Sequence, residues 1–323
     1  MIDAVASWAH LVDHLAPIWR ALPEDERGTF YVGKRTLVEH AASRGVRATV
    51  GYPHDPGPPT LVANYHDLTQ THIRRRVAYL EHGAGQTYAG DFAAHPSYSG
   101  GTDRQRVALF LTLNETTAER ERAAYPDSAV VVVGSPHLDE LAAVIPVAPE
   151  ERRVAFAFHW DCHLVDETRE TFRYWRRAVH DLAAAGTPVL GHSHPRIADT
   201  LERHFVRWGV PFTRDLEVVI ARASVLCFDN TSAGYEAAAL GVPVVALNSP
   251  RYRRDVEHGL RFWDLIPGPQ ADDPHELVEA IAEAPGPEWS DRRREVSARV
   301  YPPVTRGRAA DLAVAAVREH LAR

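Results

Sequence analysis

Short runs of β-branched and apolar residues alternate with longer helical patterns along the whole chain of 323 residues. This alternation is typical of βαβ units, in which parallel strands are covered by helices on both faces. Because such strands must be buried on both sides, the pattern restricts the chain to the α/β class. In the first half it predicts strands at residues 29–32, 48–52, 60–64, 77–81, 107–113 and 129–133.

The length indicates two domains, since single hydrophobic cores stop growing beyond about 250–300 residues. Residues 144–152 hold two prolines and a charge run between a helical pattern and a new strand, and form the predicted linker. The predicted domains are 1–146 and 147–323, with a last helical pattern at 304–321 that is long enough to pack back on the first domain. The second domain repeats the rhythm, with strands expected at 154–158, 188–191, 225–228 and 243–247.

Composition excludes several classes of protein. The first 22 residues place acidic residues and histidines among apolar positions, and so predict an amphipathic helix rather than a secretion signal. No run approaches 18 apolar residues, so we expect no transmembrane segment. Two isolated cysteines cannot form a disulfide framework, which favours a cytoplasmic location. A formal charge of −7 disfavours a general nucleic-acid-binding surface.

Polar residues follow the predicted strand at 225–228, and ligands of open parallel sheets bind outside the carboxyl ends of strands. Asp229 and Asn230 lead into Thr231 and Ser232, which open a helical pattern. Unpaired N–H groups and the positive end of the helix dipole would favour an anion there. Ordinary capping by the two hydroxyls is the alternative. Glu236, one turn further on, could accept the hydroxyls of a ribose or could be a solvated helix residue.

Two neighbouring strand ends carry imidazoles. His159 and Trp160 follow the strand at 154–158, and His194 follows the strand at 188–191 directly before Pro195. A residue before proline is held extended, which could direct the ring of His194 into a cleft, although a surface loop histidine explains it equally well. Zinc needs a defined ligand spacing, which residues 159–163 lack, so we expect no metal.

In the first domain, the fourth predicted strand ends at Glu81 and is followed by His82, Gly83 and Gly85. In the standard strand order this strand lies beside the first, at the point where the order reverses. A neutral histidine can take a proton from an attacking hydroxyl, and its usual pKa near 6.5 suits neutral pH. The two glycines would allow backbone N–H groups to approach a phosphate, or they form an ordinary turn. His14 on the N-terminal helix could also reach the cleft, but a structural histidine is the favoured interpretation.

With these residues in view, the chain resembles the CDP-glycerol glycerophosphotransferase family of wall teichoic acid synthesis, within the GT-B glycosyltransferase architecture. The family's His-Gly and His-Pro elements resemble His82-Gly83 and His194-Pro195. Its Asp, two hydroxyl residues and downstream Gly-x-Pro resemble Asp229, Thr231, Ser232 and residues 241–243. Residues 134–136, Gly-Ser-Pro, followed by Leu138-Asp139, resemble the segment that ends the family's first domain.

The resemblance implies a GT-B-like α/β fold, with two Rossmann-like domains whose parallel sheets face a central cleft. Domain 1–146 would bind the acceptor, and domain 147–323 the nucleotide-diphosphate donor. It implies inverting, metal-independent transfer with His82 as general base and with His194, Thr231 and Ser232 around the donor phosphates. No cofactor is expected, since the activated donor is itself a substrate. Residues 159–163 and Asn230 depart from the family pattern, so the donor is either CDP-glycerol or a nucleotide sugar.

Expected acceptors are a small molecule, a glycan or a polyol phosphate. DNA is a less favoured acceptor, because the acidic net charge leaves only local arginine clusters to bind it. Two other functions share this architecture. A non-hydrolysing nucleotide-sugar 2-epimerase would consume no acceptor, and a non-catalytic GT-B-like nucleotide-binding protein would not depend on His82.

Overall fold

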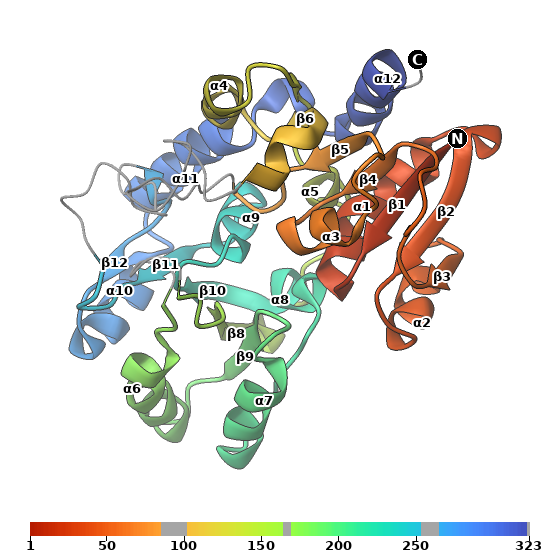
Figure 1. Cartoon of the computed structure of the whole chain (residues 1–323). Helices are drawn as coiled ribbons and strands as arrows, with labels where there is room; N and C mark the ends of the chain where they lie inside the picture. Colours follow the sequence, from red (N-terminus) through yellow and green to blue (C-terminus); the bar gives the residue numbers. More distant parts are fainter. Residues whose placement is uncertain (85–101, 164–168, 253–264, 322–323) are drawn as a thin grey trace. The chain divides into compact units, whose positions relative to one another are not determined.

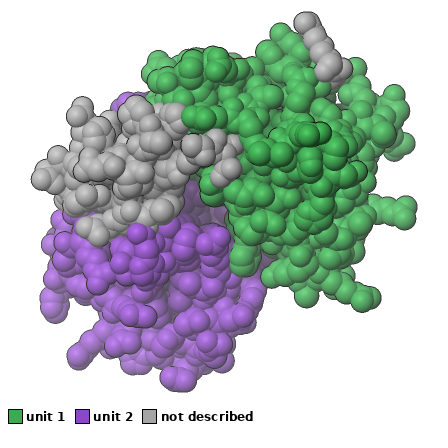
Figure 2. Space-filling view, viewed as in Figure 1, with its two compact units in different colours: residues 1–140, 301–323 green, residues 141–300 purple. Residues whose placement is uncertain are grey.

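The computed structural model describes residues 1–84, 102–163, 169–252 and 265–321. Contacts between residues divide the chain into two compact units (Figure 2). Unit 1 consists of Met1–Glu140 and Tyr301–Arg323, and unit 2 of Leu141–Val300. The predicted boundary is 146/147, whereas the chain enters unit 2 at Leu141 and returns to unit 1 at Tyr301. Gly85, predicted to bind the donor, lies outside the described residues.

In the described part of unit 1, seven parallel strands form one sheet in the order β3-β2-β1-β4-β5-β6-β7 (Figure 1). Every neighbouring pair is parallel. The expected α/β class with a parallel sheet is therefore confirmed for this unit. The strands are β1 (Ile2–Ala6), β2 (Arg27–Val32), β3 (Ala48–Val50), β4 (Thr60–Val62), β5 (Val77–Leu80), β6 (Val107–Thr112) and β7 (Ala129–Val132).

Helices bury both faces of this sheet, because alternate residues of a strand point to opposite sides. Ala4 and Leu61 belong to a core shared with α1, α2 and α12, whereas Val5 and Val62 belong to a second core shared with α3 and α4. The last helix, α12, packs on α1 and β6. The helices are α1 (Ala9–Ala21), α2 (Thr36–Ser43), α3 (Tyr65–Gln70), α4 (Glu115–Ala124), α5 (Pro136–Leu141) and α12 (Ala309–Leu321).

The predicted helix over the first 22 residues is wrong at its start. Ile2–Ala6 is a strand, β1, and all five of its residues are buried. The helix begins only at Ala9 and runs to Ala21. The alanines, together with Asp3, resemble a helical face in the sequence, but pairing with β2 and β4 on both sides makes the segment a central strand. Local propensity is overridden here by tertiary pairing.

This missed strand also moves the point at which the strand order reverses. β1 lies between β2 and β4, so the reversal falls between β1 and β4. The prediction that the strand before His82 occupies this position is wrong, since β5 lies one strand further along, between β4 and β6. The carboxyl end of β5 still lies at the same edge of the sheet as the ends of β1 and β4.

In the described part of unit 2, five parallel strands form a sheet in the order β12-β11-β10-β8-β9, and the order reverses between β8 and β10. The four strands predicted for the second half are confirmed, and the short β12 was not expected. The strands are β8 (Arg153–Phe158), β9 (Val189–Ser193), β10 (Ala223–Phe228), β11 (Val244–Leu247) and β12 (Gln270–Ala271). The helices are α6 (Phe172–Ala184), α7 (Ala198–Arg207), α8 (Leu216–Arg222), α9 (Ala233–Ala239), α10 (Leu277–Glu283) and α11 (Pro287–Val300).

The core of unit 2 is aromatic on one side of its sheet. Phe156 and Phe158 of β8 pack with Trp175 of α6 and Phe205 of α7. The indole N–H of Trp175 donates to the carbonyl oxygen of Asn248 at 2.7 Å, which satisfies the polar atom of this buried side chain. In the part of the chain that the structure describes, no helix is both long enough and apolar enough to cross a membrane.

A buried ionisable cluster lies in unit 1 beside the end of β5. Glu81, which directly precedes His82, lies 3.6 Å from the guanidinium of Arg104. Arg104 also donates to the hydroxyl of Tyr79 at 3.1 Å. Glu121 of α4 is fully buried, and its burial together with the charge of Glu81 raises its pKa to about 10. Glu81 therefore carries the charge that Arg104 balances, and Glu121 is protonated at neutral pH.

Replacing Glu121 with Gln should raise the stability of the protein above pH 5. In the folded state Glu121 holds its proton up to about pH 10, whereas the unfolded chain releases it near its usual value of 4.5. The contribution of Glu121 to stability is therefore greatest below pH 4.5 and falls as pH rises toward 10, by about 1.4 kcal/mol for each pH unit. Glu121→Gln keeps the shape and removes this slope. Urea unfolding at pH 5.5 and pH 8.5 measures the difference.

Glu81→Gln is the matched control for this measurement. It removes the charge that faces Arg104, so it should destabilise the protein at both pH values, because a buried guanidinium then lacks its counter-charge. A Glu121→Gln protein with the same pH dependence of unfolding as the unchanged protein would show that Glu121 is ionised in the folded state.

Candidate active site

Asp229, directly after β10, joins the two strand ends at which the order of unit 2 reverses. Its carboxylate is fully buried and accepts the backbone N–H of His159, which follows β8, at 2.9 Å. It also accepts the hydroxyl of Thr171 at 3.1 Å and the N–H of Thr231 at 3.2 Å. Because Asp229 is saturated by these donors, it organises the loops that carry the other candidate residues.

Helix α9 begins beside this carboxylate. Thr231 and Ser232 precede its first turn and are both partly exposed. Among the described residues, Ser232 makes no side-chain capping hydrogen bond, and the hydroxyl of Thr231 reaches the N–H of Ala233 only at 3.5 Å. The alternative interpretation is that these hydroxyls simply cap the helix. For the described residues the structure shows at most one long capping hydrogen bond, from the N–H of Ala233 to Thr231. Both hydroxyls can donate to a ligand at this helix start.

Glycine allows α9 to lie very close to its strand. A Cβ atom added to Gly234 would lie 2.2–2.4 Å from ring atoms of Phe228. This approach brings Asn230 and Glu236 into buried positions, with 2% and 3% of their surfaces exposed. The alternative interpretation of Glu236 as a solvated helix residue is therefore not what the structure shows. Glu236 instead lies within electrostatic range of His192, whose pKa is lowered by burial.

The imidazoles predicted at the ends of β8 and β9 come together. The rings of His159 and His194 meet edge to face, with their centroids 5.2 Å apart. The ring of Trp160 lies 6.2 Å from that of His194 and carries the guanidinium of Arg196 at 4.2 Å from its own centroid. Sequence analysis missed Arg196, although its position two residues after His194 was the signal that could have revealed it. His159, Trp160, His194 and Arg196 together offer aromatic ring faces and one positive charge.

Further along the same loop, Asp161 is committed to ion pairs. It accepts from the guanidinium of Arg169 at 2.7 Å and lies 3.1 Å from the ring of His163. The hydrogen bond from Arg169 holds the pKa of Asp161 at about 2. Asp161 therefore remains ionised and holds residues on either side of the loop together.

In unit 1, His82 is surrounded by other histidines. Its ring centroid lies 5.5 Å from that of His14 and 5.9 Å from that of His10, both on α1. His14 in turn lies 4.7 Å from His137 of α5, in an edge contact. The favoured interpretation of His14 as a structural histidine did not anticipate its contact with His82, which the less favoured alternative, that His14 reaches the cleft, is closer to. The signal was available, since His10 and His14 are one helical turn apart.

Gly83 supplies the turn after His82. Its φ of 84° lies in the left-handed region that glycine tolerates, and its carbonyl oxygen accepts the hydroxyl of Tyr301 at 3.3 Å. Tyr301 is the first residue of the C-terminal part of unit 1. The loop that carries His82 is thus tied to the returning chain.

Residues 134–139, which follow strand β7, also have a structural role. Ser135 accepts the N–H of Leu138 at 3.2 Å and caps α5. Asp139 accepts the N–H groups of Gly307 at 2.7 Å and of Ala309, the first residue of α12, at 3.0 Å. This segment, part of the family resemblance, therefore fixes α12 in unit 1.

The actual reversal point of unit 1 holds a buried carboxyl that sequence analysis missed. Asp67 accepts the N–H of Ser7, the residue after β1, at 3.1 Å. Burial raises the pKa of Asp67 to about 7. The residue was overlooked because β1 itself was not predicted. Its contact fixes the turn from β1 into α1, and hence the start of the helix that carries His10 and His14.

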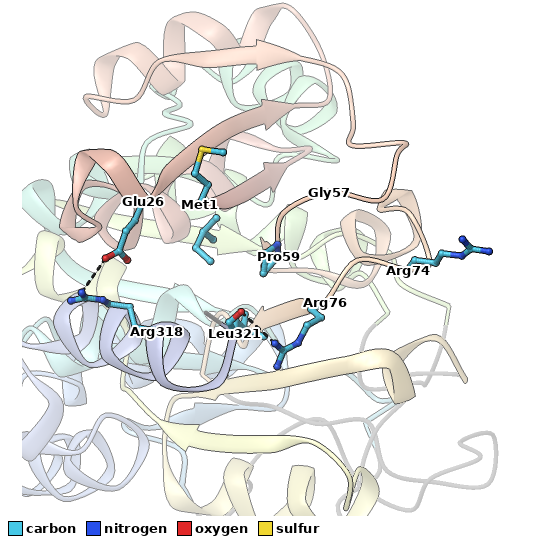
Figure 3. Close-up of a pocket in the computed structure, with 9 residues that line it drawn as sticks. Met1, Glu26, Gly57, Pro59, Arg74, Arg76, Arg318 and Leu321 are labelled. Atoms are coloured by element: carbon cyan, nitrogen blue, oxygen red, sulfur yellow. Dashed lines mark hydrogen bonds and ion pairs between the residues drawn. The ribbon is translucent and has the colours of Figure 1, made fainter. Parts of the chain in front are cut away.

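A cavity of about 700 Å³ in unit 1 lies away from all these residues (Figure 3). It opens at the amino ends of the strands, beside Met1, Gly57 and Pro59. Arg76 in its wall donates to the carbonyl oxygens of His320 and Leu321, and Arg318 pairs with Glu26 at 3.0 Å. These arginines attach α12 to the sheet. Because ligands of such sheets bind at the carboxyl ends, the candidate active site lies elsewhere.

Comparison with known protein families and with curated proteins finds no match. Solved structures, however, resemble the whole chain. S. aureus MnaA in complex with UDP has a TM-score of 0.70 at 12% identity, covering 99% of this chain and 96% of that one. The UDP-GlcNAc 2-epimerase of Neisseria meningitidis bound to UDP-GlcNAc has a TM-score of 0.60 at 11% identity, covering 98% and 99%. The wall teichoic acid polymerase TagF has a TM-score of 0.62 at 12% identity, covering 99% and 88%.

At such low identity the likeness concerns the fold alone. These proteins share two sheets of parallel strands covered by helices, as found here in units 1 and 2. The expected GT-B-like fold is confirmed, and the neighbours comprise both of the enzyme classes that the sequence suggested. The chain therefore has the GT-B-like fold of nucleotide-sugar 2-epimerases and of a teichoic acid polymerase.

Proposed function

We propose that this protein is a transferase that moves a glycosyl or glycerophosphoryl group from a nucleotide-diphosphate donor to an acceptor hydroxyl. The observation that carries the proposal is the placement of polar groups on a GT-B-like fold. Each unit has its candidate residues at the carboxyl ends of its strands, where such sheets bind ligands. Unit 2 offers anion-binding groups, and unit 1 offers a histidine that can act as a base.

In this proposal unit 2 binds the donor. The diphosphate is held by the hydroxyls of Thr231 and Ser232 and by His194, whose backbone N–H is anchored on the carbonyl oxygen of Phe158 at 2.8 Å. Arg196, missed by sequence analysis, supplies a positive charge beside them. Asp229, buried behind the helix start, holds Thr231 in place. Hydroxyls, an imidazole and a guanidinium are the groups that bind phosphate oxygens without a metal ion.

In this proposal the nucleoside of the donor contacts the other side chains at the same strand ends. Trp160 and His159 offer ring faces on which a base can stack. Glu236 is buried one turn into α9, where a carboxylate can accept ribose hydroxyls. CDP-glycerol and nucleotide sugars share this diphosphate and ribose, so the proposal covers both donors.

The proposed reaction is inverting and metal-independent, with His82 as general base. An acceptor hydroxyl oxygen attacks the transferred group and forms the new bond as the bond to the nucleotide leaving group breaks. The hydroxyl proton passes to a ring nitrogen of His82, and the electron pair of the broken bond leaves on the phosphate oxygen of the nucleotide. The negative charge that develops there is stabilised by the groups at the start of α9. Acceptors are small molecules, glycans or polyol phosphates.

A second candidate is a non-hydrolysing nucleotide-sugar 2-epimerase, which is favoured by the likeness in fold to two proteins crystallised with UDP or UDP-GlcNAc. An epimerase would interconvert a nucleotide sugar with no acceptor present. Incubation of the protein with UDP-GlcNAc alone, followed by separation of the sugar nucleotides, distinguishes this activity from transfer.

Removing the two hydroxyls at the start of α9 should weaken nucleotide binding. The Thr231→Ala, Ser232→Ala double variant loses two hydrogen bonds to a charged phosphate, each of about 1.5–3 kcal/mol. The Kd for UDP or CDP, measured by titration calorimetry, should therefore rise at least about 100-fold. Thr200→Ala, an exposed position on α7, is the control and should leave the Kd unchanged. Equal affinity of the double variant and the control would remove this site from the proposal.

Replacing His82 with Ala should abolish turnover and leave donor binding intact. Loss of a general base lowers kcat by about 100-fold to 10,000-fold. Transfer from radiolabelled donor and the Kd for the nucleotide are measured side by side. The control is His66→Ala on α3, an exposed histidine of the same unit. Near-normal transfer by His82→Ala would rule out the proposed mechanism and would show that another group acts as the base.

A further inference from the structure

Four imidazoles of unit 1, one of which is the proposed base His82, form a cluster. His10 and His14 lie one turn apart on α1, His82 follows β5, and His137 lies on α5. The ring centroids are 5.9 Å apart for His10 and His82, 5.5 Å for His14 and His82, and 4.7 Å for His14 and His137. His14 is the member that touches both His82 and His137, so it occupies the middle of the cluster.

These separations allow neighbouring rings to share a hydrogen. An N–H···N bond of about 2.9 Å, with one ring radius at either end, brings two imidazole centroids to roughly 5 Å. His14 lies at that range from His82, with an angle of 59° between the ring planes. His10 is the more distant neighbour, and it is less buried than His14. The geometry therefore singles out His14 as the partner of His82.

His14 is well suited to accept a hydrogen bond at neutral pH. It is 6% exposed, and its burial, reinforced by His137, His82 and His10, lowers its pKa well below 6.5. A neutral imidazole has one N–H and one unprotonated nitrogen. The nearest carboxylate on the same helix, Asp13, is committed to His40 and Arg44 and acts electrostatically on His137. His14 can therefore accept a hydrogen without bringing a charge to His82.

We propose that His14 is a positioning residue that fixes the tautomer of His82 by accepting the hydrogen of one of its ring nitrogens. The other ring nitrogen of His82 is thereby left unprotonated and available for the acceptor hydroxyl. His137 contacts the ring of His14, with the two centroids 4.7 Å apart, and restricts its rotation. A buried carboxylate performs this task in serine hydrolases and raises the basicity of its histidine. A neutral imidazole fixes the tautomer without that increase. This inference rests on the proposed role of His82.

The first test is spectroscopic and needs no substrate. Long-range ¹H–¹⁵N spectra of the full chain labelled in its histidines report the tautomer and the titration of each ring, and His82→Ala assigns the His82 signals. The unchanged protein, kept in a chelator, should show one predominant tautomer of His82. His14→Phe should give a mixture of both tautomers. His14→Gln, whose amide oxygen accepts a hydrogen bond, should restore the single form. Signals of the exposed His180 in unit 2 report whether each variant is folded.

The second test is kinetic. His14→Phe should lower kcat about 10-fold to 100-fold, as loss of an orienting partner commonly does, with little change in the KM for the donor. His14→Gln should recover most of the activity, and His10→Phe should have a smaller effect than His14→Phe. The lower limb of the pH dependence of kcat should shift in His14→Phe and remain in place in His14→Gln, since loss of the hydrogen bond changes the single macroscopic pKa that the two tautomers of His82 share.

The outcomes separate this inference from the proposed function. If neither the unchanged protein nor any variant transfers the group, the proposed function fails; if His82→Ala retains transfer, the role of His82 as base fails, whatever the tautomer. If His82→Ala is inactive but His14→Phe leaves the tautomer and kcat unchanged, the role of His14 is overturned and the base remains. Stoichiometric binding of Zn²⁺ that shifts the ring nitrogens of His14, His82 and His137 together would also overturn it, since the cluster would then be a metal site.

Discussion

The parallel pairing of buried strands is the constraint on which the rest of this structure depends. Within each sheet the described strands all run parallel to one another, so the carboxyl ends of neighbouring strands meet at one edge of that sheet. The strands themselves must be apolar because helices cover both faces. Polar groups that the chain brings together are therefore collected where the strands end. Asp229 and His159 follow adjacent strands, and His194 follows the next strand across the sheet.

Buried polar groups at these edges are held by specific partners. Asp229 is saturated by two backbone N–H groups and one hydroxyl, and this fixes the loop that carries Thr231. Asp67 plays the matching part in unit 1 by accepting the N–H of Ser7 where β1 ends. In both units a buried aspartate accepts backbone N–H hydrogen bonds from the adjoining loops and so positions the start of a helix. The side chains proposed to meet a ligand are the more exposed ones beside it.

Burial also sets the protonation of the groups near His82. Beside Arg104, Glu121 keeps its proton because its burial, together with the charge of Glu81, raises its pKa. Burial likewise keeps His14 neutral. The surroundings of His82 therefore include the neutral imidazole of His14 and, on the side of Glu81, the ion pair with Arg104. Such surroundings can orient an imidazole without permanently protonating it.

The sequence by itself determined the fold class, ten of the twelve strands found among the described residues, and the residues at the strand ends of unit 2. These features are local, because a buried strand followed by a polar turn can be recognised within about ten residues. Only the tertiary structure decided that Ile2–Ala6 is a central strand, that Glu236 is buried and that Arg196 lies over Trp160. It also decided that His14, distant in sequence, lies beside His82. The physical reason is that strand pairing and burial are properties of neighbours in space, and the same short apolar segment can be a helix or a strand until those neighbours are present.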